Sequence, residues 1–375
     1  MSSSEIYIQA TTQVSAARNA DFPSGQHQLS AFSAEDNRQV GRLHLHFERQ
    51  LQQLLQEHPT YSKLDRSVQL ALLTAQKLQA KLPDTKQRIG INIGSSRGAT
   101  ESWEREYQNF TQQGSTSIAA SPTTSLGNIS SWVGQFLHLN AMPFSHSMTC
   151  STSLLSVLNG MAWLRAGMAD IMLVGGAEAS LTPFTLAQLQ AMRLYGRDSQ
   201  FPSQAGNFVK KANAMILGEA AALAILTTNP QQSIAKIAGI GMASEPIHSP
   251  TYISQEATHL QHSMQAALQD ANLSSVDVVV SHTPGTLHGD RAEKHAIQHV
   301  LGHEVPITNN KWQIGHTFGA SGIMSLVFAL EMFRINTYIP TPFTTGVQPK
   351  TLQHILINAT GFGGNAVSII LQKTN

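Results

Sequence analysis

Residues 145–176 read SHSMTCSTSLLSVLNGMAWLRAGMADIMLVGG, and this stretch indicates the fold class. A short extended segment ends at Thr149, and an apolar helix is expected from about Ser151 to Ala166, closed by Gly167. The run Ala169–Gly176 then predicts a buried strand, because it is almost wholly apolar. A strand, a helix and a second strand in this order are typical of a layered α/β architecture.

The same alternation continues on both sides of this stretch. Upstream, the spacing of apolar residues predicts a helix over about Gln39–Gln56, and Asp65 is expected to cap another helix. Further strands are expected at 88–93, 220–226, 234–242, 276–280, 305–308, 355–358 and 367–371, and further helices at 121–137, 254–271, 292–301 and 322–334. Because the pattern restarts after a polar linker at 227–233, we expect two halves, residues 1–230 and residues 231–375.

Composition excludes several classes of protein. The chain has 375 residues with 24 Lys plus Arg against 23 Asp plus Glu, a formal charge of +1. Proteins that coat nucleic acid are strongly basic, so no nucleic-acid partner is expected. No run approaches eighteen consecutive apolar residues, so no membrane span is expected. The N-terminus lacks the character of a signal peptide, which predicts a cytoplasmic protein.

The spacing of Cys, His and acidic residues in the sequence predicts no metal site. The single Cys excludes an intrachain disulfide and Cys-rich clusters, and no HExxH, CxxC or EF-hand spacing occurs. His259 and His262 are expected to be two exposed positions on a helix.

Cys150 directly precedes the helix expected at 151–166. Free N–H groups and the helix dipole at that end favour a thiolate and lower a thiol pKa below its usual value of about 8.5, which suits a nucleophile. The alternative is a buried, inert cysteine that acts as a small hydrophobic residue.

Two of the sixteen histidines lie where site residues tend to lie in α/β proteins. His282 directly follows the strand Val278–Val280, and His316 lies in a glycine-containing loop before a helix. A surface or structural position remains the alternative for each. In the turn 361–364, Gly-Phe-Gly-Gly, the glycines allow backbone N–H groups to approach an oxyanion, although a tight hairpin turn is the simpler interpretation.

Together these segments resemble the β-ketoacyl-acyl carrier protein synthases, condensing enzymes of the thiolase superfamily. The matching stretches are MTCSTSLLSVLNG, ADIMLVGGAEA, LGEAAALAIL, VVVSHTPGT, NNKWQIGHTFGASG and ATGFGGNAVSIIL, in the family's order. The resemblance covers the chain from about Asp65 to its end and implies a thiolase-like fold, a duplicated α-β-α-β-α layered sandwich. The stretches SSRGATESW and SPTTSLGNISSW are similar to synthases of bacterial aryl-polyene or flexirubin-type pigment clusters, which implies a specialised polyene, polyketide or fatty-acid-like pathway.

The resemblance also implies roles for the matching residues. Cys150 would take an acyl group from acyl carrier protein as a thioester. His282 and His316 would stabilise the enolate that forms when malonyl-carrier loses CO2, and this enolate would attack the acyl-Cys in a decarboxylative Claisen condensation. The backbone N–H groups of Cys150 and Phe362 would form the oxyanion hole, and Phe362 matches the family's gating aromatic residue.

Three further residues carry over, and two motifs depart from the family pattern. Lys311 and Glu293 match a buried charged pair that organises the site, and Thr286 matches a contact to the phosphopantetheine arm of the carrier. The family's His-Gly-Thr-X-Thr reads HTPGT here, so Pro284 replaces one hydroxyl contact. The family's Gly-Phe-Gly-Gly-Thr-Asn reads GFGGNA.

The resemblance implies partners but no bound cofactor, because the substrates travel on the phosphopantetheine of the carrier protein. The implied partners are acyl carrier protein and either a second copy of the chain or a related ketosynthase-like chain. Arg97, Lys210 and Lys211 are candidates for docking the acidic carrier, with a solvated surface as the alternative for the two lysines.

Two other functions remain open. A non-catalytic partner of a second synthase, like a chain length factor, usually lacks the Cys, whereas this chain retains Cys150 and both histidines. Pro284 and the barely recognisable N-terminal strand favour that role. A non-decarboxylating thiolase typically uses a second Cys near its C-terminus, and this chain has none.

Overall fold

The computed structural model describes residues 4–33, 37–82, 87–126, 128–196, 201–249, 252–302, 305–344 and 348–374. Its main sheet has the strand order β10-β9-β11-β12-β8-β1-β7-β6-β4-β5. These strands are β1 (Ile6–Val14), β4 (Ile89–Gly94), β5 (Ala141–Phe144), β6 (Ile171–Glu178), β7 (Ala220–Thr227), β8 (Ala235–Ser244), β9 (Val278–Val280), β10 (Ile307–Thr308), β11 (His354–Gly361) and β12 (Asn365–Lys373). Two short strands, β2 (Ser30–Ala31) and β3 (Gln39–Val40), pair separately.

The helices surround and divide this sheet. They are α1 (Leu45–Glu57), α2 (Arg66–Leu78), α3 (Thr100–Gln113), α4 (Ala120–Thr124), α5 (Asn128–Phe136), α6 (Thr152–Arg165), α7 (Pro183–Ala191), α8 (Thr258–Ala271), α9 (Leu287–Leu301), α10 (Lys311–Ile314) and α11 (Ser321–Ile335). Short 3-10 turns lie at Asn19–Ser24, Pro59–Lys63, Gln79–Lys81 and Phe318–Ala320. Asp65 caps α2 as predicted, since its Oδ1 accepts the Ser67 N–H at 2.9 Å.

The two halves of the sheet have the same strand order. From the centre outward, the first set runs β1-β7-β6-β4-β5 and the second runs β8-β12-β11-β9-β10. In both sets the first strand along the chain is followed in space by the fifth, fourth, second and third. The sets join where Ile6–Ile8 pairs antiparallel with Ala235–Ile237. The duplicated α/β, thiolase-like architecture predicted from the sequence is confirmed.

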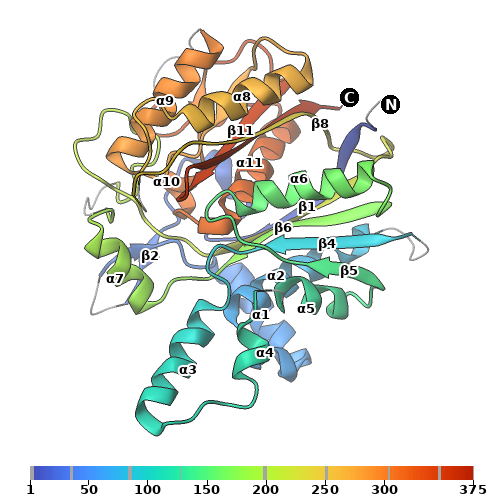
Figure 1. Cartoon of the computed structure of the whole chain (residues 1–375), viewed down its shortest axis with the longest axis vertical. Coiled ribbons are helices and arrows are strands. Elements are labelled where there is room, and N and C mark those ends of the chain that lie inside the picture. The colour runs from blue at the N-terminus through green and yellow to red at the C-terminus, as the bar shows by residue number, and fades with distance from the viewer. Residues whose placement is uncertain are drawn as a thin grey trace.

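Five layers result from this duplication. Figure 1 shows α8 and α9 over the outer face of the C-terminal strands, α6 and α11 between the two sets, and α2 and α5 against the N-terminal strands. Successive residues of β6 alternate between two cores, because successive side chains of a strand point to opposite faces. Met172 and Val174 belong to the central core, whereas Ile171 and Leu173 belong to the core beneath α1 and α2. The central layer therefore packs against both sets of strands.

Helix α11 is apolar on all sides because it lies in the central layer. The segment Phe318–Ile335 has the length and composition of a membrane span, yet 89% of it is buried inside the fold. It is therefore the core helix of a globular domain and does not indicate a membrane protein.

Some predicted helices were wrong in extent or were missed. The helix expected from Gln39 begins at Leu45, because Gln39–Val40 forms β3. The helix expected at 121–137 is divided into α4 and α5, and α7 was not predicted. Helix α3 also escaped prediction, because the residues that it buries are Thr100 and Ser102 and its aromatic residues face outward.

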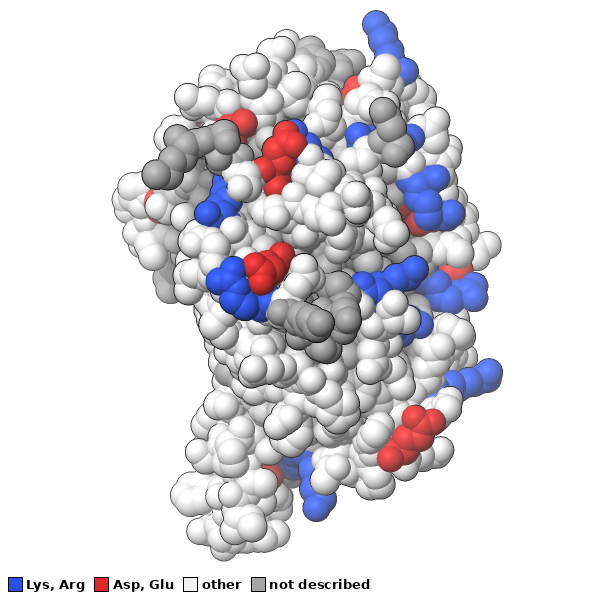
Figure 2. Space-filling model, turned by 90° about the vertical axis from the view of Figure 1, so that its right-hand side faces the viewer, with Lys and Arg blue, Asp and Glu red and all other residues white. Residues whose placement is uncertain are grey.

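The surface carries little charge. Figure 2 shows one face on which most residues are white and the charged side chains lie in small separate groups of both signs. This pattern agrees with a charged content of 13%. It gives this face no broad basic surface of the kind that nucleic acid requires.

Candidate active site

Cys150 lies in a tight turn between β5 and the N-terminus of α6. Thr149 has φ +49°, in the left-handed region that β-branched residues rarely adopt. The turn is held by Ser151 N, which donates to Met148 O at 3.3 Å, and by Met148 N, which donates to Thr152 Oγ1 at 2.8 Å. Such strain is typical of functional turns, and here it presents the Cys150 thiol at the start of the helix.

His316 contacts this thiol directly. Its Nε2 lies 3.3 Å from Cys150 Sγ, and its Nδ1 lies 2.8 Å from Ser321 Oγ. The backbone of His316 is bound to the strand-like segment 216–218, since His316 N donates to Ile216 O and Gly218 N donates to His316 O. Gly315, at φ +79°, permits this approach, because a Cβ there would lie 2.7 Å from Leu217 backbone atoms.

His282 completes the cluster. Its ring centroid lies 5.2 Å from that of His316, nearly perpendicular to it at 85°. The potential ligand atoms of Cys150, His282 and His316 all lie within 4.8 Å of one another. The structure thus brings together the thiol and both histidines singled out in the sequence.

Glu293 holds the backbone of the His282 loop. Its two carboxylate oxygens accept the N–H groups of His282 at 2.8 Å and Thr283 at 2.6 Å, and one also accepts Asn358 Nδ2 at 3.2 Å. Burial nevertheless raises the pKa of Glu293 above its ordinary value, opposed by these hydrogen bonds. Glu293 therefore positions His282 through the main chain.

Lys311 is buried, and its Nζ has no hydrogen-bond partner among the described residues. The pair that the resemblance implied is an electrostatic one here, since no ion-pair contact joins Lys311 to Glu293 among the described residues. Burial lowers the pKa of Lys311, while Glu293 and Cys150 act in the opposite direction.

Burial sets the protonation of the cluster. It lowers the pKa of His316 to about 3 and the pKa of His282 well below its usual value, and the charge of Lys311 contributes to both shifts. Both imidazoles are therefore neutral near pH 7. Burial, followed by Glu178, raises the pKa of Cys150 to about 12, with Lys311 opposing. The predicted lowering of the thiol pKa by the helix N-terminus was thus wrong in sign, because desolvation dominates.

Glu178 is a buried acidic residue beside the cluster that sequence reasoning missed, and its charge contributes to the raised pKa of Cys150. It is fully buried at the end of β6 and accepts hydrogen bonds from Ser96 N at 2.8 Å, Gly319 N at 3.1 Å and Ser180 Oγ at 2.8 Å. A Cβ at Gly319 would lie 3.0 Å from its Oε2. A single acidic residue at the end of the apolar strand ADIMLVGGAE was the available signal.

The turn Gly361–Gly364, which we call the Phe362 turn, lies against the nucleophile. A Cβ at Gly361 would lie 1.8 Å from Thr149 Oγ1 and 2.9 Å from Cys150 N, so only glycine fits there. Phe362 O accepts hydrogen bonds from Thr149 Oγ1 at 3.2 Å and Asn365 Nδ2 at 3.1 Å. The backbone of the turn and the backbone of Cys150 are therefore neighbours, as an oxyanion hole would require.

A pocket of about 360 Å³ opens onto the cluster. Its described lining includes Cys150, His282, His316, Glu293, Thr286, Pro284 and Phe362, together with apolar residues such as Leu189, Met215 and Leu260. Thr286 Oγ1 also accepts the Gly289 N–H at 3.2 Å and caps α9, which leaves its hydroxyl proton available to donate.

The spacing of Cys150, His282 and His316 would also suit a metal ion. The nearby ammonium of Lys311, whose charge lowers the pKa of both imidazoles, opposes a second cation at that point. His259, expected to be exposed, is instead completely buried beside this pocket, whereas His262 is exposed.

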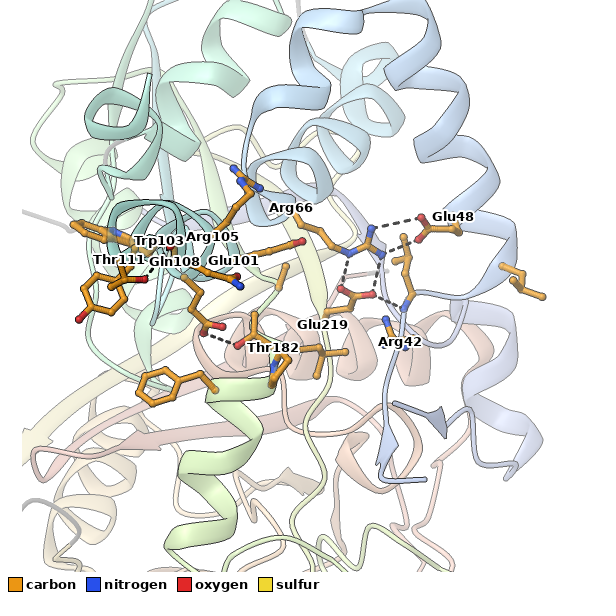
Figure 3. Close-up of a pocket in the computed structure, with 18 residues that line it drawn as sticks. Arg42, Glu48, Arg66, Glu101, Trp103, Arg105, Gln108, Thr111, Thr182 and Glu219 are labelled. Atoms are coloured by element: carbon orange, nitrogen blue, oxygen red, sulfur yellow. Dashed lines mark hydrogen bonds and ion pairs between the residues drawn. The ribbon is translucent and has the colours of Figure 1, made fainter. Parts of the chain in front are cut away.

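A larger groove of about 1120 Å³ lies elsewhere, between α3, α7 and the start of α1. Figure 3 shows Arg66 between Glu48 and Glu219, with guanidinium contacts of 2.7 Å to each. Although burial disfavours its charge, Glu219 and Glu48 hold the pKa of Arg66 above its usual value. This ion network is satisfied within the chain, and the groove contains no member of the Cys-His-His cluster.

The basic residues considered for carrier docking differ in exposure. Lys210 was a wrong candidate, because its side chain is buried and its Nζ lies 2.5 Å from Asp290 Oδ2. Arg97 and Lys211 are exposed, and Arg97 Nη2 donates to Gln188 Oε1 at 2.9 Å.

Comparison with known proteins identifies the family of the chain and agrees with its fold. A family model described as the β-ketoacyl synthase N-terminal domain matches residues 10–232, and a model of the β-ketoacyl synthase C-terminal domain matches residues 234–345. The chain is 27% identical over 272 residues to nodulation protein E of Rhizobium meliloti (strain 1021), an alignment covering 68% of this chain and 64% of that protein. The chain thus spans slightly less than two thirds of the length of this relative.

Two further similarities point the same way. The chain is 26% identical over 316 residues to 3-oxoacyl-[acyl-carrier-protein] synthase 2 of Vibrio cholerae serotype O1, covering 76% of each protein. A solved structure described as the ishigamide ketosynthase/chain length factor superposes with a TM-score of 0.86 at 17% identity, covering 100% of both chains. At this identity the likeness concerns the fold.

Proposed function

Because the chain belongs to the β-ketoacyl synthase family, we propose that it catalyses decarboxylative Claisen condensation of malonyl-acyl carrier protein with a Cys-bound acyl group. In this role it is an acyltransferase, a 3-oxoacyl-acyl carrier protein synthase. The observation that carries the proposal is the contact of 3.3 Å between Cys150 Sγ and His316 Nε2, with His282 beside it in one pocket.

In the first half-reaction, Cys150 is the nucleophile. Its thiol proton passes to His316 Nε2 as the sulfur attacks the carbonyl carbon of the acyl-carrier thioester. The raised pKa of Cys150 makes this transfer necessary, because little free thiolate exists near pH 7. The tetrahedral oxyanion is held by the N–H groups of Cys150 and Phe362, and collapse releases the carrier thiol, which takes the proton back from His316.

In the second half-reaction, His282 and His316 act as neutral hydrogen-bond donors. For His316 the ring proton now lies on Nε2, and the Ser321 hydroxyl donates to Nδ1. Both bind the thioester carbonyl oxygen of malonyl-carrier, and the C–C bond to the carboxylate breaks to give CO2 and an enolate. The enolate carbon attacks the acyl-Cys carbonyl, and the Cys150 thiolate is expelled to give the β-ketoacyl-carrier. The thiolate then takes up one proton from solvent, which restores the thiol. Low pKa values for both imidazoles support this role, since a neutral donor matches a developing enolate.

Two supporting residues complete the proposed site. Glu293 positions His282 through backbone hydrogen bonds, and Lys311 supplies positive potential that favours the Cys150 thiolate. Thr286 contacts the phosphopantetheine arm at the pocket mouth. We propose no cofactor bound by the protein, because the reacting groups arrive on the carrier.

The proposed carrier contact lies beside the catalytic pocket. A second hollow of about 560 Å³ shares Asn213 with the catalytic pocket, and Arg38, Arg193 and Lys211 line it. None of its described lining residues carries a carboxylate. The cationic side chains of Arg193 and Lys211 there suit the phosphate of the arm and an acidic carrier surface.

A second ketosynthase-like chain, identical or related, is the other proposed partner. Helix α3 projects from the body of the fold in Figure 1 and exposes Trp103, Tyr107 and Phe110 on one stripe. Exposed aromatic residues at this spacing support a protein contact.

The location of the protein, its pathway and its division into two halves are also proposals. We propose a cytoplasmic protein of a specialised polyene, polyketide or fatty-acid-like pathway, on the basis of SSRGATESW and SPTTSLGNISSW. The repeated strand order supports the division into a half with the nucleophile, 1–230, and a half with both histidines, 231–375.

Intact-protein mass spectrometry tests the proposed reaction. The purified chain, incubated with an acyl carrier thioester, should gain the mass of the acyl group, and Cys150→Ala should not. The exposed Ser147→Ala variant, three residues away, is the matched control and should be acylated normally. Acylation of the Cys150→Ala variant would refute the nucleophile.

A non-catalytic partner role, like that of a chain length factor, is the second candidate. Pro284 in the HTPGT loop favours it. Malonyl decarboxylation or condensation by the chain alone would exclude a partner-only role. Activity that appears only with a second synthase carrying its own Cys, and that persists in Cys150→Ala, would establish it.

A further inference from the structure

His259 is a buried histidine next to the catalytic pocket that the proposed mechanism does not use. It lies in the first turn of α8 and is 0% exposed, between the end of β8 and the end of β11. Its charge is near enough to His282 to contribute to the lowered pKa of that catalytic residue. A fully buried histidine at such a place requires partners for both ring nitrogens.

Those partners form a chain that ends at the Phe362 turn. Nε2 lies 2.8 Å from Thr360 Oγ1 in a hydrogen bond, and Nδ1 lies 3.0 Å from Glu245 Oε2, an ion-pair distance without hydrogen-bond geometry. Thr360 Oγ1 in turn donates to the carbonyl oxygen of Asn365 at 2.8 Å. Thr360 directly precedes the turn and Asn365 directly follows it, so the chain closes the base of the turn.

The donors and acceptors among His259, Thr360 and Asn365 indicate which nitrogen of His259 carries a proton. Since the Thr360 hydroxyl donates to Asn365 O, His259 must donate from Nε2 to Thr360. Nδ1 faces a carboxylate, and this contact is also favourable only when Nδ1 carries a proton. Burial lowers the pKa of His259, although Glu245 opposes this shift. The Nε2–H donor toward Thr360 is therefore the contact that a neutral ring keeps, and Nδ1 then has no hydrogen-bond partner among the described residues.

Glu245 is a fixed anchor for this arrangement. Its carboxylate accepts Ser254 N at 3.0 Å, Ser254 Oγ at 2.7 Å and Thr258 Oγ1 at 2.8 Å. Burial opposes its ionisation, but these hydrogen bonds and His259 outweigh burial and lower the pKa of Glu245 to about 2. Glu245 N also donates to Gly364 O at 2.8 Å, so this residue contacts the turn through the main chain as well.

The Phe362 turn is thus held from two sides. On the side of the nucleophile, Thr149 Oγ1 and Asn365 Nδ2 donate to Phe362 O, and Ser151 Oγ donates to Asn365 Oδ1. On the opposite side stand Glu245 and His259. Gly363 and Gly364, at φ +94° and +67°, provide no side chain that would stiffen the turn between these supports.

We propose that His259 is a positioning residue that fixes the Phe362 turn through Thr360, so that the Phe362 N–H points at the oxyanion formed on Cys150. Glu245 orients the imidazole, and the Thr360 hydroxyl transmits its position to the strand ends on both sides of the turn. The role deepens the proposed condensing reaction and rests on it. It acts in the acyl-transfer step, because that step uses the Phe362 N–H.

Two amide variants separate the two nitrogens of His259. In His259→Gln the side-chain amide reaches the position of Nε2 and keeps a donor toward Thr360. In His259→Asn the amide reaches only the position of Nδ1 and keeps the contact toward Glu245. We expect acylation of Cys150 by acyl-carrier to be about ten- to a hundredfold slower in His259→Asn and less than about threefold slower in His259→Gln. Thr360→Ser should resemble the wild type, and Thr360→Val should resemble His259→Asn.

Malonyl decarboxylation is the internal control, because it depends on His282 and His316. It should remain within about threefold of wild type in both amide variants, and His262→Asn on the same helix should change neither reaction. Equal acylation rates in His259→Gln and His259→Asn would overturn the proposal. So would a parallel loss of both reactions, which is the result of a general structural role.

Hydrogen exchange of the backbone provides a readout independent of activity. The peptide 359–366 should exchange faster in His259→Asn and Thr360→Val than in the wild type, His259→Gln or Thr360→Ser. Unchanged exchange in all variants would refute the link to the turn. If the wild-type chain shows no condensation but exchange follows this order, the positioning role stands and the proposed reaction fails.

Discussion

The two halves of the chain repeat one strand order but place different chemistry at equivalent points. The third strand of the first half leads to Cys150 and α6, whereas the third strand of the second half leads to His316 and α11. The fourth strands end at Glu178 in one half and at the Phe362 turn in the other. Both central helices begin near the same point, so equivalent positions face each other across the layer.

This difference teaches how a duplicated fold can make an asymmetric site. Each half supplies one buried helix start and one set of strand ends, and the pairing brings unlike residues into contact. Cys150 Sγ meets His316 Nε2 at 3.3 Å because α6 and α11 pack side by side in the central layer. The nucleophile and its proton acceptor are therefore equivalent in position but opposite in role.

The largest effect should come from His316, the residue that faces Cys150. His316→Ala removes both the acceptor for the thiol proton and one enolate donor, so we expect condensation to fall by about a thousandfold. Steady-state product formation measured by mass spectrometry checks this, with exposed His299→Ala as control. A loss below tenfold would contradict the assigned contact.

His282 should separate the two half-reactions. His282→Ala leaves the Cys150–His316 contact intact but removes one enolate donor, so malonyl decarboxylation should fall by about a hundredfold. Acylation of Cys150 should change by less than about threefold. Release of CO2 and intact mass give the two rates, and an equal fall in both would show that His282 also serves the first step.

Gly361 tests the contact between the two halves directly. A methyl group there would clash with Thr149 Oγ1 and crowd Cys150 N, so Gly361→Ala should destabilise the fold by about 1–3 kcal/mol and slow acylation. Gly167→Ala is a control of the same chemistry at a positive-φ helix end with open space, where only backbone strain is added. Denaturant unfolding compares the two, and equal acylation rates would contradict the close approach.

The pH dependence of the thiol tests the electrostatics of the site without a mutation. Because the pKa of Cys150 is raised to about 12, its thiolate fraction keeps growing through the range where an ordinary thiol is already ionised. Alkylation by iodoacetamide should accelerate by about tenfold per pH unit from about pH 7 to about pH 9. A plateau near the ordinary thiol pKa of about 8.5 would show that the helix N-terminus and Lys311 overcome burial.

Much of the fold could be predicted from the sequence, because buried strands and the central helices carry strong apolar patterns. The strand at 171–178 and the helix at 152–165 were placed within two residues of their positions. Helix α3 was missed for a physical reason. Its apolar face is turned to solvent, and the residues that it buries are small and polar, so no inward hydrophobic period exists.

Part of the candidate active site could also be predicted from the sequence. Cys150, His282 and His316 follow strand ends or precede helices, and this local position was the signal. Glu178 and His259 act through contacts with residues far away in the sequence, such as Gly319 and Thr360. The periodicity of apolar residues along the sequence does not report contacts between distant residues. For His259 the sequence therefore predicted an exposed helix position. The sign of the Cys150 pKa shift likewise depends on burial, which only the assembled layers define.

The pairing between β1 and β8 has a consequence for how the chain is made. Ile6 lies beside Ile237, and Thr11 lies beside Ala224. Strand β1 is therefore synthesised long before the strands with which it pairs. Until then its backbone groups and its share of the central apolar core stay uncovered. Pairing across such sequence separation slows folding and exposes the nascent chain to aggregation. We therefore expect chaperone dependence during synthesis to follow from the late pairing of β1 with β7 and β8.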